Sequence, residues 1–247
     1  MRTLILAVAT LVAATPVVAA DIDDKVNAAL AAESRPEGDR ERDRNRMPLR
    51  TLKFFGLEDD MRVLELIPGG GWYTRVLAPV LADSGKLYVA LGTGRVKERV
   101  LTEPGFEKVS VVEDEANMRR EPGARYYTMD AFDLDVDNID MVLTFRNVHN
   151  FDAEGRARMH AAAFEALKSG GVYGVVDHTM RHMEPETPEN RRRFDPVLAI
   201  KEIQAAGFEF VDYSTLHYRA DDELEYEVGR RSVSGNTDRF TFLFRKP

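Results

Sequence analysis

VLELIPGGGWYT, residues 63–74, decides the fold prediction for this chain. An apolar run that contains one acid, Glu65, leads directly into three glycines at 69–71. A short apolar run ended by glycine is typical of a buried strand. Glycines at the end of a strand allow the backbone to pass close to a ligand, although a plain turn is the other interpretation. The stretch predicts a strand, a ligand-binding turn and the start of a helix.

Strand-like and helix-like stretches alternate through the rest of the chain. The expected strands are residues 61–67, 86–91, 108–114, 124–130, 138–145 and 171–178, and the expected helices are 69–85, 95–106, 153–171 and 190–208. Two late strands, 208–216 and 238–247, have no full-length helix between them and are expected to form an antiparallel hairpin at the sheet edge. This order predicts an α/β fold with a doubly wound, mostly parallel sheet in one domain.

Composition narrows the classes of function. The 247 residues are 44% hydrophobic, which supports a packed core, and their net charge is −8. This acidity argues against a nucleic-acid partner, because such a surface needs basic residues to neutralise phosphates. The chain has no cysteine, which excludes disulfides, thiolate metal sites and cysteine nucleophiles.

The N-terminus differs from the rest of the chain. Residues 1–20 combine one early arginine, an apolar run and a small-residue ending, which predicts a secretory signal peptide cleaved after Ala20. An uncleaved anchor is the alternative, but Pro16 interrupts the run and it is short for a membrane span. The expected location is periplasmic or secreted, with no stable membrane insertion after cleavage. Residues 21–50 are arginine-rich and are expected to form a polar N-terminal arm, either solvated or an exposed helix.

Eight segments together resemble the class I S-adenosylmethionine-dependent methyltransferases, and among them a group of exported bacterial proteins described as predicted methyltransferases. These segments are RDRNRMP (42–48), FFGL (54–57), ELIPGGGWYT (65–74), MDAFDL (129–134), TFRNVHNF (144–151), GVVDH (174–178), AAGF (205–208) and TDRFTFLFRKP (237–247). The resemblance covers almost the whole chain after about residue 35. It implies a Rossmann-like domain over residues 51–247 and S-adenosyl-L-methionine as cofactor.

The resemblance also implies roles for particular residues. The residues implied to bind the cofactor are Glu65, Gly69, Gly71, Trp72, Tyr73, Asp130, Ala131 and Asn147. Glu65 and the two glycines match the loop around the amino-acid end of the cofactor, although Ile67 replaces its first glycine. Trp72 and Tyr73 either wall the cofactor site or pack against the N-terminal arm. Asp130 matches an acid that accepts from the adenine amino group, with a helix cap as the alternative.

One position departs from the family pattern. The second strand is followed by Leu91, where the family has an acid that accepts hydrogen bonds from both ribose hydroxyls. Losing such a charged acceptor typically costs about 1.5–3 kcal/mol. We expect either a different way of holding the ribose or weakened cofactor binding. Substituting glutamate at position 91 is expected to restore the acceptor if the cofactor lies in the usual pose.

Candidate catalytic residues end two neighbouring strands. His149 follows the strand at 138–145, and Asp177 and His178 end the strand at 171–178. Histidine titrates near neutral pH, so His149 is a candidate general base that Asp177 would orient. Backbone-satisfying roles for the histidines are the alternative. Two histidines and one carboxylate are also metal-ligand types, but no helical spacing supports a metal, and none is predicted.

The favoured hypothesis is a methyltransferase acting on a small molecule. Arg40, Arg42, Arg46 and Arg191–Arg193 are candidates to close over the site, which makes an acidic substrate one possibility. The alternative is an exported, non-catalytic ligand-binding protein that keeps the methyltransferase fold. Export and Leu91 favour this alternative, whereas the number of matching segments favours the enzyme.

Overall fold

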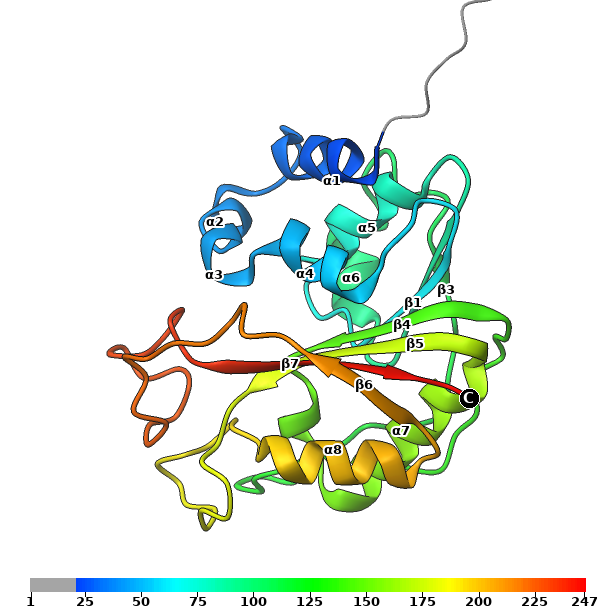
Figure 1. The fold of residues 1–247 in the computed structure, drawn as a ribbon. Coiled ribbons are helices and arrows are strands. Elements are labelled where there is room, and N and C mark those ends of the chain that lie inside the picture. Colours follow the sequence, from blue (N-terminus) through cyan, green and yellow to red (C-terminus); the bar gives the residue numbers. More distant parts are fainter. Residues whose placement is uncertain (1–20) are drawn as a thin grey trace, which may run out of the picture.

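The computed structural model describes residues 21–247 (Figure 1). The predicted signal peptide, residues 1–20, lies outside the described residues and stays a prediction. The described part forms a seven-stranded sheet in the order β3-β2-β1-β4-β5-β7-β6. The strands are β1 (Arg62–Leu66), β2 (Lys86–Ala90), β3 (Ser110–Val111), β4 (Ile139–Phe145), β5 (Leu167–His178), β6 (Glu209–Tyr213) and β7 (Arg239–Arg245). This is the predicted α/β fold.

Helices cover both faces of the sheet (Figure 1). On one face lie α1 (Ile22–Ala31), α2 (Glu37–Arg40), α3 (Asp43–Arg46), α4 (Pro48–Phe55), α5 (Thr74–Leu81) and α6 (Gly94–Arg99). On the other lie α7 (Ala153–Ala166) and α8 (Pro196–Ala205), and a short 3-10 helix, η1 (Val148–Asn150), follows β4. None of the helices in the described range is long and apolar enough to cross a membrane.

The sheet is parallel at its centre and antiparallel at one edge. Strand β1 pairs in parallel with β2 and β4, and four of its five residues are buried. Burial on both faces explains why this strand reads as a continuous apolar run rather than an alternating one. Strand β7 pairs antiparallel with both β5 and β6, which confirms the expected late hairpin. The carboxyl ends of β1, β4 and β5 therefore meet at one edge.

Several expected elements have other bounds in the structure. The helix expected at 153–171 ends at Ala166, where β5 begins with Leu167, and the helix expected at 95–106 ends at Arg99. Residues 124–130 form only isolated bridges, of which Tyr127 to Phe151 is one, and not a strand. The last long helix begins at Pro196 and not at residue 190, because Asp195 caps it by accepting from the Val197 N–H (2.8 Å). The helix after the glycines begins only at Thr74, since residues 69–73 form turns.

The arginine-rich segment 21–50 is folded onto the domain and is not a solvated arm. Val26 and Ala29 of α1 are buried in the same apolar cluster as helix α5 and strand β1. The guanidinium of Arg35 bonds both carboxylate oxygens of Asp43 at 2.7 and 2.8 Å. Some of the charged side chains of this segment therefore pair with each other and stabilise the segment itself.

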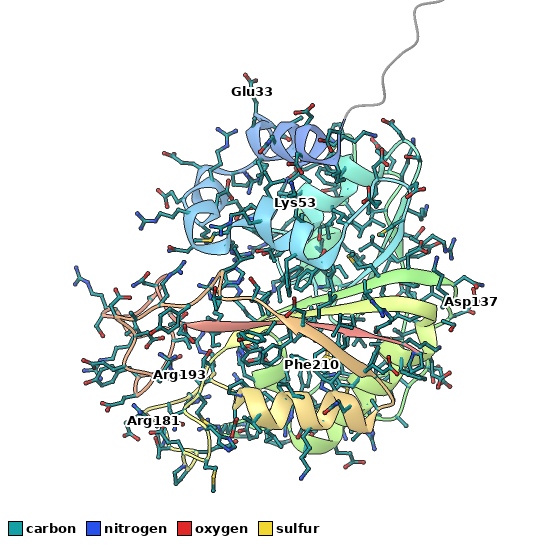
Figure 2. All side chains as sticks on the ribbon, viewed as in Figure 1. Glu33, Lys53, Asp137, Arg181, Arg193 and Phe210 are labelled. Carbon is teal, nitrogen blue, oxygen red and sulfur yellow. The ribbon has the colours of Figure 1, made fainter. Side chains whose placement is uncertain are left out.

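Side chains also fix the long loops between β5, α8 and β7 (Figure 2). Arg193 is 2% exposed and bonds both carboxylate oxygens of Asp222 at 2.9 and 2.8 Å. Its Nε donates to the carbonyl of Tyr226 at 2.7 Å. Every face of this guanidinium is satisfied within the fold, so Arg193 joins residues 179–195 to the loop before β7 and does not close over a site, contrary to the sequence-based expectation.

Candidate functional site

A cavity of about 510 Å³ opens at the carboxyl edge of β1, β4 and β5, a typical volume for a small-molecule site. Ligands of doubly wound folds bind at this edge. Its lining includes seven of the residues predicted to bind cofactor or act in catalysis: Glu65, Gly69, Trp72, Tyr73, Asn147, His149 and His178. Asp177 is hydrogen-bonded to the lining residue His149, whereas Gly71, Asp130 and Ala131 are not part of the lining.

The three glycines after β1 serve different purposes. Gly69 and Gly70 line the cavity, and a Cβ added at either would meet nothing within 4 Å. Gly71 has a φ of +80°, and its added Cβ would lie 2.4 Å from Cγ2 of Val100. Gly71 is therefore required by the packing of the loop against α6, while Gly69 and Gly70 leave open backbone for a ligand.

Three non-glycine residues at this edge have left-handed backbone conformations. Ile67 follows β1 with a φ of 56°, Leu91 follows β2 with 61°, and Arg146 follows β4 with 63°. This conformation is uncommon outside glycine and is a clear outlier for a β-branched isoleucine. Strained backbone of this kind clusters at ligand sites, where the surrounding structure enforces it. All three strand ends are thus turned sharply at the carboxyl edge of the sheet, and Ile67 and Arg146 also line the cavity.

Glu65 is a buried acid at the base of the cavity. It is 3% exposed, and its carboxylate accepts from the Thr74 hydroxyl at 2.6 Å. Burial raises its pKa to about 7, although the Thr74 hydrogen bond and the charge of Arg46 oppose the shift. Glu65 is therefore close to half protonated at neutral pH and can either accept or donate a proton to a bound ligand.

This raised pKa predicts how the parent and a Glu65→Gln variant differ in stability. Protonated Glu65 favours the folded state, so its contribution is complete below about pH 4.5 and is lost as the pH rises through about 7. The parent should lose about 3 kcal/mol relative to Glu65→Gln over this range, by 1.36 kcal/mol per pKa unit. Urea unfolding of both proteins from pH 4 to 8 measures it. A difference that stays constant with pH would mean that Glu65 titrates at its ordinary value.

Trp72 and Tyr73 contact both the cavity and the N-terminal helices. Trp72 donates from Nε1 to the carbonyl of Asp39 at 2.9 Å, and its ring lies 4.3 Å below the guanidinium of Arg46. Tyr73 stacks on Phe145 of β4, with ring centroids 3.5 Å apart. Trp72 therefore packs against the N-terminal segment, and both aromatic rings line the cavity. Their role as a wall of the cofactor site stays a prediction.

Asn147 braces the glycine loop from the neighbouring strand. Its side-chain amide donates to the carbonyl of Ile67 at 3.2 Å and lies 3.4 Å from that of Leu66. These carbonyls belong to the strained turn after β1, so Asn147 holds that turn in place. It also lines the cavity, where its remaining amide oxygen is available.

His149 and Asp177 form the hydrogen-bonded pair expected from the sequence. His149 Nδ1 lies 2.5 Å from Asp177 Oδ1, and the other carboxylate oxygen accepts from the His149 backbone N–H at 3.0 Å. The carboxylate can only accept, so it places a proton on Nδ1 and leaves Nε2 as an acceptor. Within residues 21–247 nothing bonds Nε2, which points away from Asp177 in a residue that lines the cavity.

His178 is a neighbour of this pair with a different environment. Its Nδ1 lies 2.8 Å from the Thr237 hydroxyl. Burial, and then the charge of Arg239, hold the pKa of His178 well below its ordinary range, so it is neutral at pH 7. No group of three or more His, Asp and Glu side chains in residues 21–247 is arranged to hold a metal ion.

Leu91 does not face the cavity. Glutamate at this position is therefore not expected to restore a ribose acceptor, contrary to the sequence-based prediction. Its side chain is fully buried in the core, in one cluster with Leu66 and Ala90. In the sequence, no acid lies within three residues of Leu91. The structure instead brings Asp114 from beyond β3, where its Oδ2 accepts from the Leu91 N–H at 3.2 Å. Only the parallel pairing of β2 with β3 reveals this acid.

Asp130 and Ala131 lie outside the main cavity. The Asp130 carboxylate is 46% exposed and bonds Arg119 at 2.7 Å, which holds its pKa below the ordinary value. Ala131 and Phe132 instead line a second cavity of about 820 Å³, together with Asp114. Five acids line this second cavity, Glu113, Asp114, Glu115, Asp133 and Asp135, and Asp130 is not among them.

The arginines predicted to close over the site separate into distinct groups. Arg42 and Arg46 line the main cavity, whereas Arg40 donates to the carbonyl of Ala32. Arg192 lines it as well, paired with a glutamate of the loop before β7. Two further arginines from α6 and one from the end of β4, which the sequence analysis did not single out, complete the lining: Arg95, Arg99 and Arg146.

Comparison with protein-family models and with curated proteins finds no match to this sequence. Solved structures do match. A SAM-dependent methyltransferase from Aquifex aeolicus has a TM-score of 0.57 at 15% identity, over 90% of this chain and 97% of that one. The glycopeptide N-methyltransferase MtfA in complex with S-adenosyl-L-methionine has 0.53 at 17%, over 88% and 97%. The [4+2]-cyclase SpnF has 0.55 at 16%, over 92% and 93%. The chain has the fold of SAM-dependent methyltransferases.

Proposed function

We propose that this protein is an S-adenosyl-L-methionine-dependent methyltransferase that acts on a small molecule. The observation that carries the proposal is the pairing of an open glycine turn with an oriented histidine at the same cavity. A fold alone does not establish a function, so the argument rests on these residues. S-adenosyl-L-methionine supplies an electrophilic methyl group when bound.

Residues at two cavities fit the two ends of the cofactor. Gly69, Gly70 and Glu65 offer open backbone and a buried acid to the amino-acid end. Asp114 offers a carboxylate near the end of β2, and Phe132 offers a flat apolar side chain beside it. These two residues would hold the adenosine end. The absence of an acid at position 91 therefore does not by itself argue against the cofactor.

His149 is proposed as the general base. A nucleophilic oxygen or nitrogen of the acceptor loses its proton as it forms a bond to carbon, and Nε2 of His149 would take that proton. Asp177 fixes the tautomer through Nδ1 and stabilises the imidazolium that results. His178, neutral and bonded to Thr237, adds no competing charge beside it.

Direct binding of the cofactor tests the proposal, with Gly70→Val as the matched variant. We expect calorimetry of the chain from residue 21 to detect S-adenosyl-L-methionine and S-adenosylhomocysteine. Gly70 has open space around its Cβ position and an ordinary φ, so valine there should leave the fold intact while filling the ligand's place. The affinity for both forms of the cofactor should fall at least ~10-fold, which is the loss expected when one charge-assisted hydrogen bond is removed. No binding by the parent, or equal binding by a folded Gly70→Val, would overturn the assignment.

A second candidate is a protein that keeps this fold without methyl transfer. The observation that favours it is the cluster of arginines around the cavity, which does not suit a cationic sulfonium on its own. The cyclase SpnF carries the same fold under a name that describes a different reaction. Calorimetry that detects an anionic ligand but neither form of the cofactor would favour this candidate.

A further inference from the structure

The cavity holds more positive charge than its own acids can neutralise. Six arginines line it, against Glu65, whose pKa is about 7, and Asp39. Among these arginines, Arg192 is paired with Glu227. For the other five, no side-chain ion pair is found within residues 21–247. They contrast with Arg193, which has acceptors on every face.

Arg46 is the most deeply placed of these unpaired cations. It is 5% exposed, yet no oxygen of the described chain accepts a hydrogen bond from its guanidinium. Stacking on Trp72 at 4.3 Å holds the group by its face, which leaves the N–H donors at its edge free for the cavity. A buried guanidinium without a carboxylate is costly to maintain, which is explained if a ligand supplies the anion.

Arg146 adds a second cation close to the first. It follows β4 in a left-handed conformation and lines the same cavity. Burial lowers the pKa of Arg46 to about 9, and the positive charge of Arg146 is the second cause of that shift. Arginine keeps its proton at neutral pH, so both groups carry a positive charge. Two like charges held near each other, neither of them in an ion pair with an acid of residues 21–247, favour an oxyanion that bridges them.

The cofactor cannot supply this anion in full. S-adenosyl-L-methionine carries one carboxylate against an ammonium and a sulfonium, so its net charge is positive. One arginine could pair with that carboxylate, which leaves the rest of the set without a partner. The remaining charge must belong to the other molecule in the cavity.

We propose that the methyl acceptor is a small molecule bearing carboxylate or phosphate groups. Arg46 and Arg146 bind its oxyanion within the cavity, and the more exposed Arg42, Arg95 and Arg99 surround the entrance. That the ligand is a methyl acceptor rests on the proposed function. The oxyanion site itself does not depend on that function. Planar guanidinium forks match both carboxylate and phosphate, so the two sources share one recognition chemistry.

Calorimetry with pyrophosphate and with citrate tests the site on the chain from residue 21, each in the presence and absence of S-adenosylhomocysteine. The variants are Arg46→Met, which keeps an unbranched chain over Trp72, and Arg146→Met. Arg44→Gln is the matched control, because Arg44 lies on the same helix, is exposed and does not line the cavity. We expect each methionine variant to weaken anion binding about 10–100-fold and the control to bind as the parent does.

The outcomes separate this inference from the proposed function. Tighter binding of pyrophosphate supports a phosphorylated ligand, and tighter binding of citrate supports a polycarboxylate. Failure of both anions to bind the parent under either condition overturns the oxyanion site, even if S-adenosylhomocysteine binds. Anion binding without cofactor binding keeps the site and overturns methyl transfer.

Equal weakening of anion binding in Arg44→Gln would show nonspecific attraction and overturn the inference. Thermal melts report folding, and Arg146→Met serves if Arg46→Met does not fold.

Discussion

Replacing Leu91 by glutamate is expected to destabilise the protein by about 3–5 kcal/mol, a loss typical of an uncompensated buried charge. Leu91 is fully buried in the core beside Leu66, Ala90 and Val112. A carboxylate there would have lost its water without gaining a hydrogen-bond donor among these apolar neighbours. Such a loss is comparable with the whole stability of many domains.

Urea unfolding with Leu91→Met as control isolates the charge. Methionine is close to leucine in volume and should cost less than about 1.5 kcal/mol. Both substituents share the left-handed backbone at position 91, so that strain cancels between them. The glutamate variant should recover stability as the pH falls and its carboxyl group becomes protonated. A folded Leu91→Glu that binds S-adenosylhomocysteine more tightly than the parent would show that this side chain faces the ribose after all.

Replacing Gly71 by valine is the second large effect we expect, about 2–5 kcal/mol of lost stability. The added Cβ would lie 2.4 Å from Cγ2 of Val100 and 3.0 Å from Cγ2 of Val96, distances that force the loop or α6 to move. Overpacking costs about 1–3 kcal/mol, and a left-handed conformation costs a residue with a Cβ about 1–2 kcal/mol more.

A double variant separates the two costs. Gly71→Ala should be destabilising, and Val100→Ala added to it should restore part of the loss by removing the methyl group in the way. The loss of stability that remains in the double variant measures the backbone strain of alanine at a φ of +80°. Chemical unfolding of both single variants and the double variant gives the coupling. Additive effects would mean that Gly71 and Val100 do not meet.

The fold could be predicted because each central strand is a continuous apolar run between glycines or helices. The location of the residues at the strand ends could also be predicted, because parallel strands finish at one edge of the sheet. Glu65, His149 and Asp177 lie at this edge as expected. Boundaries were less predictable where a local cap decided them, as Asp195 does at α8. Position 91 was misjudged because a strand end does not reveal which way its last side chain turns.

Contacts between distant segments could not be predicted. Asp114 reaches Leu91 across 23 residues of chain, through a strand of only two residues. Arg46 belongs to a segment whose mixed charges are typical of a solvated surface. It is buried because it packs over the ring of Trp72, which lies in another part of the sequence. Sequence periodicity reports which face of an element is apolar, but it carries no information on which distant side chain covers that face.

The position of Arg46 also has a consequence for folding kinetics. Its carbonyl oxygen lies 3.0 Å from His217 Nε2, and the neighbouring Asn45 carbonyl accepts from Arg239 at 2.8 Å. The cavity wall that carries Arg46 is thus held by residues 171 and 194 positions further along the sequence. Contacts of such large sequence separation form slowly, because the entropy of closing a long loop must be overcome first. This wall is therefore expected to form later in folding than the glycine turn after β1, whose contacts are local.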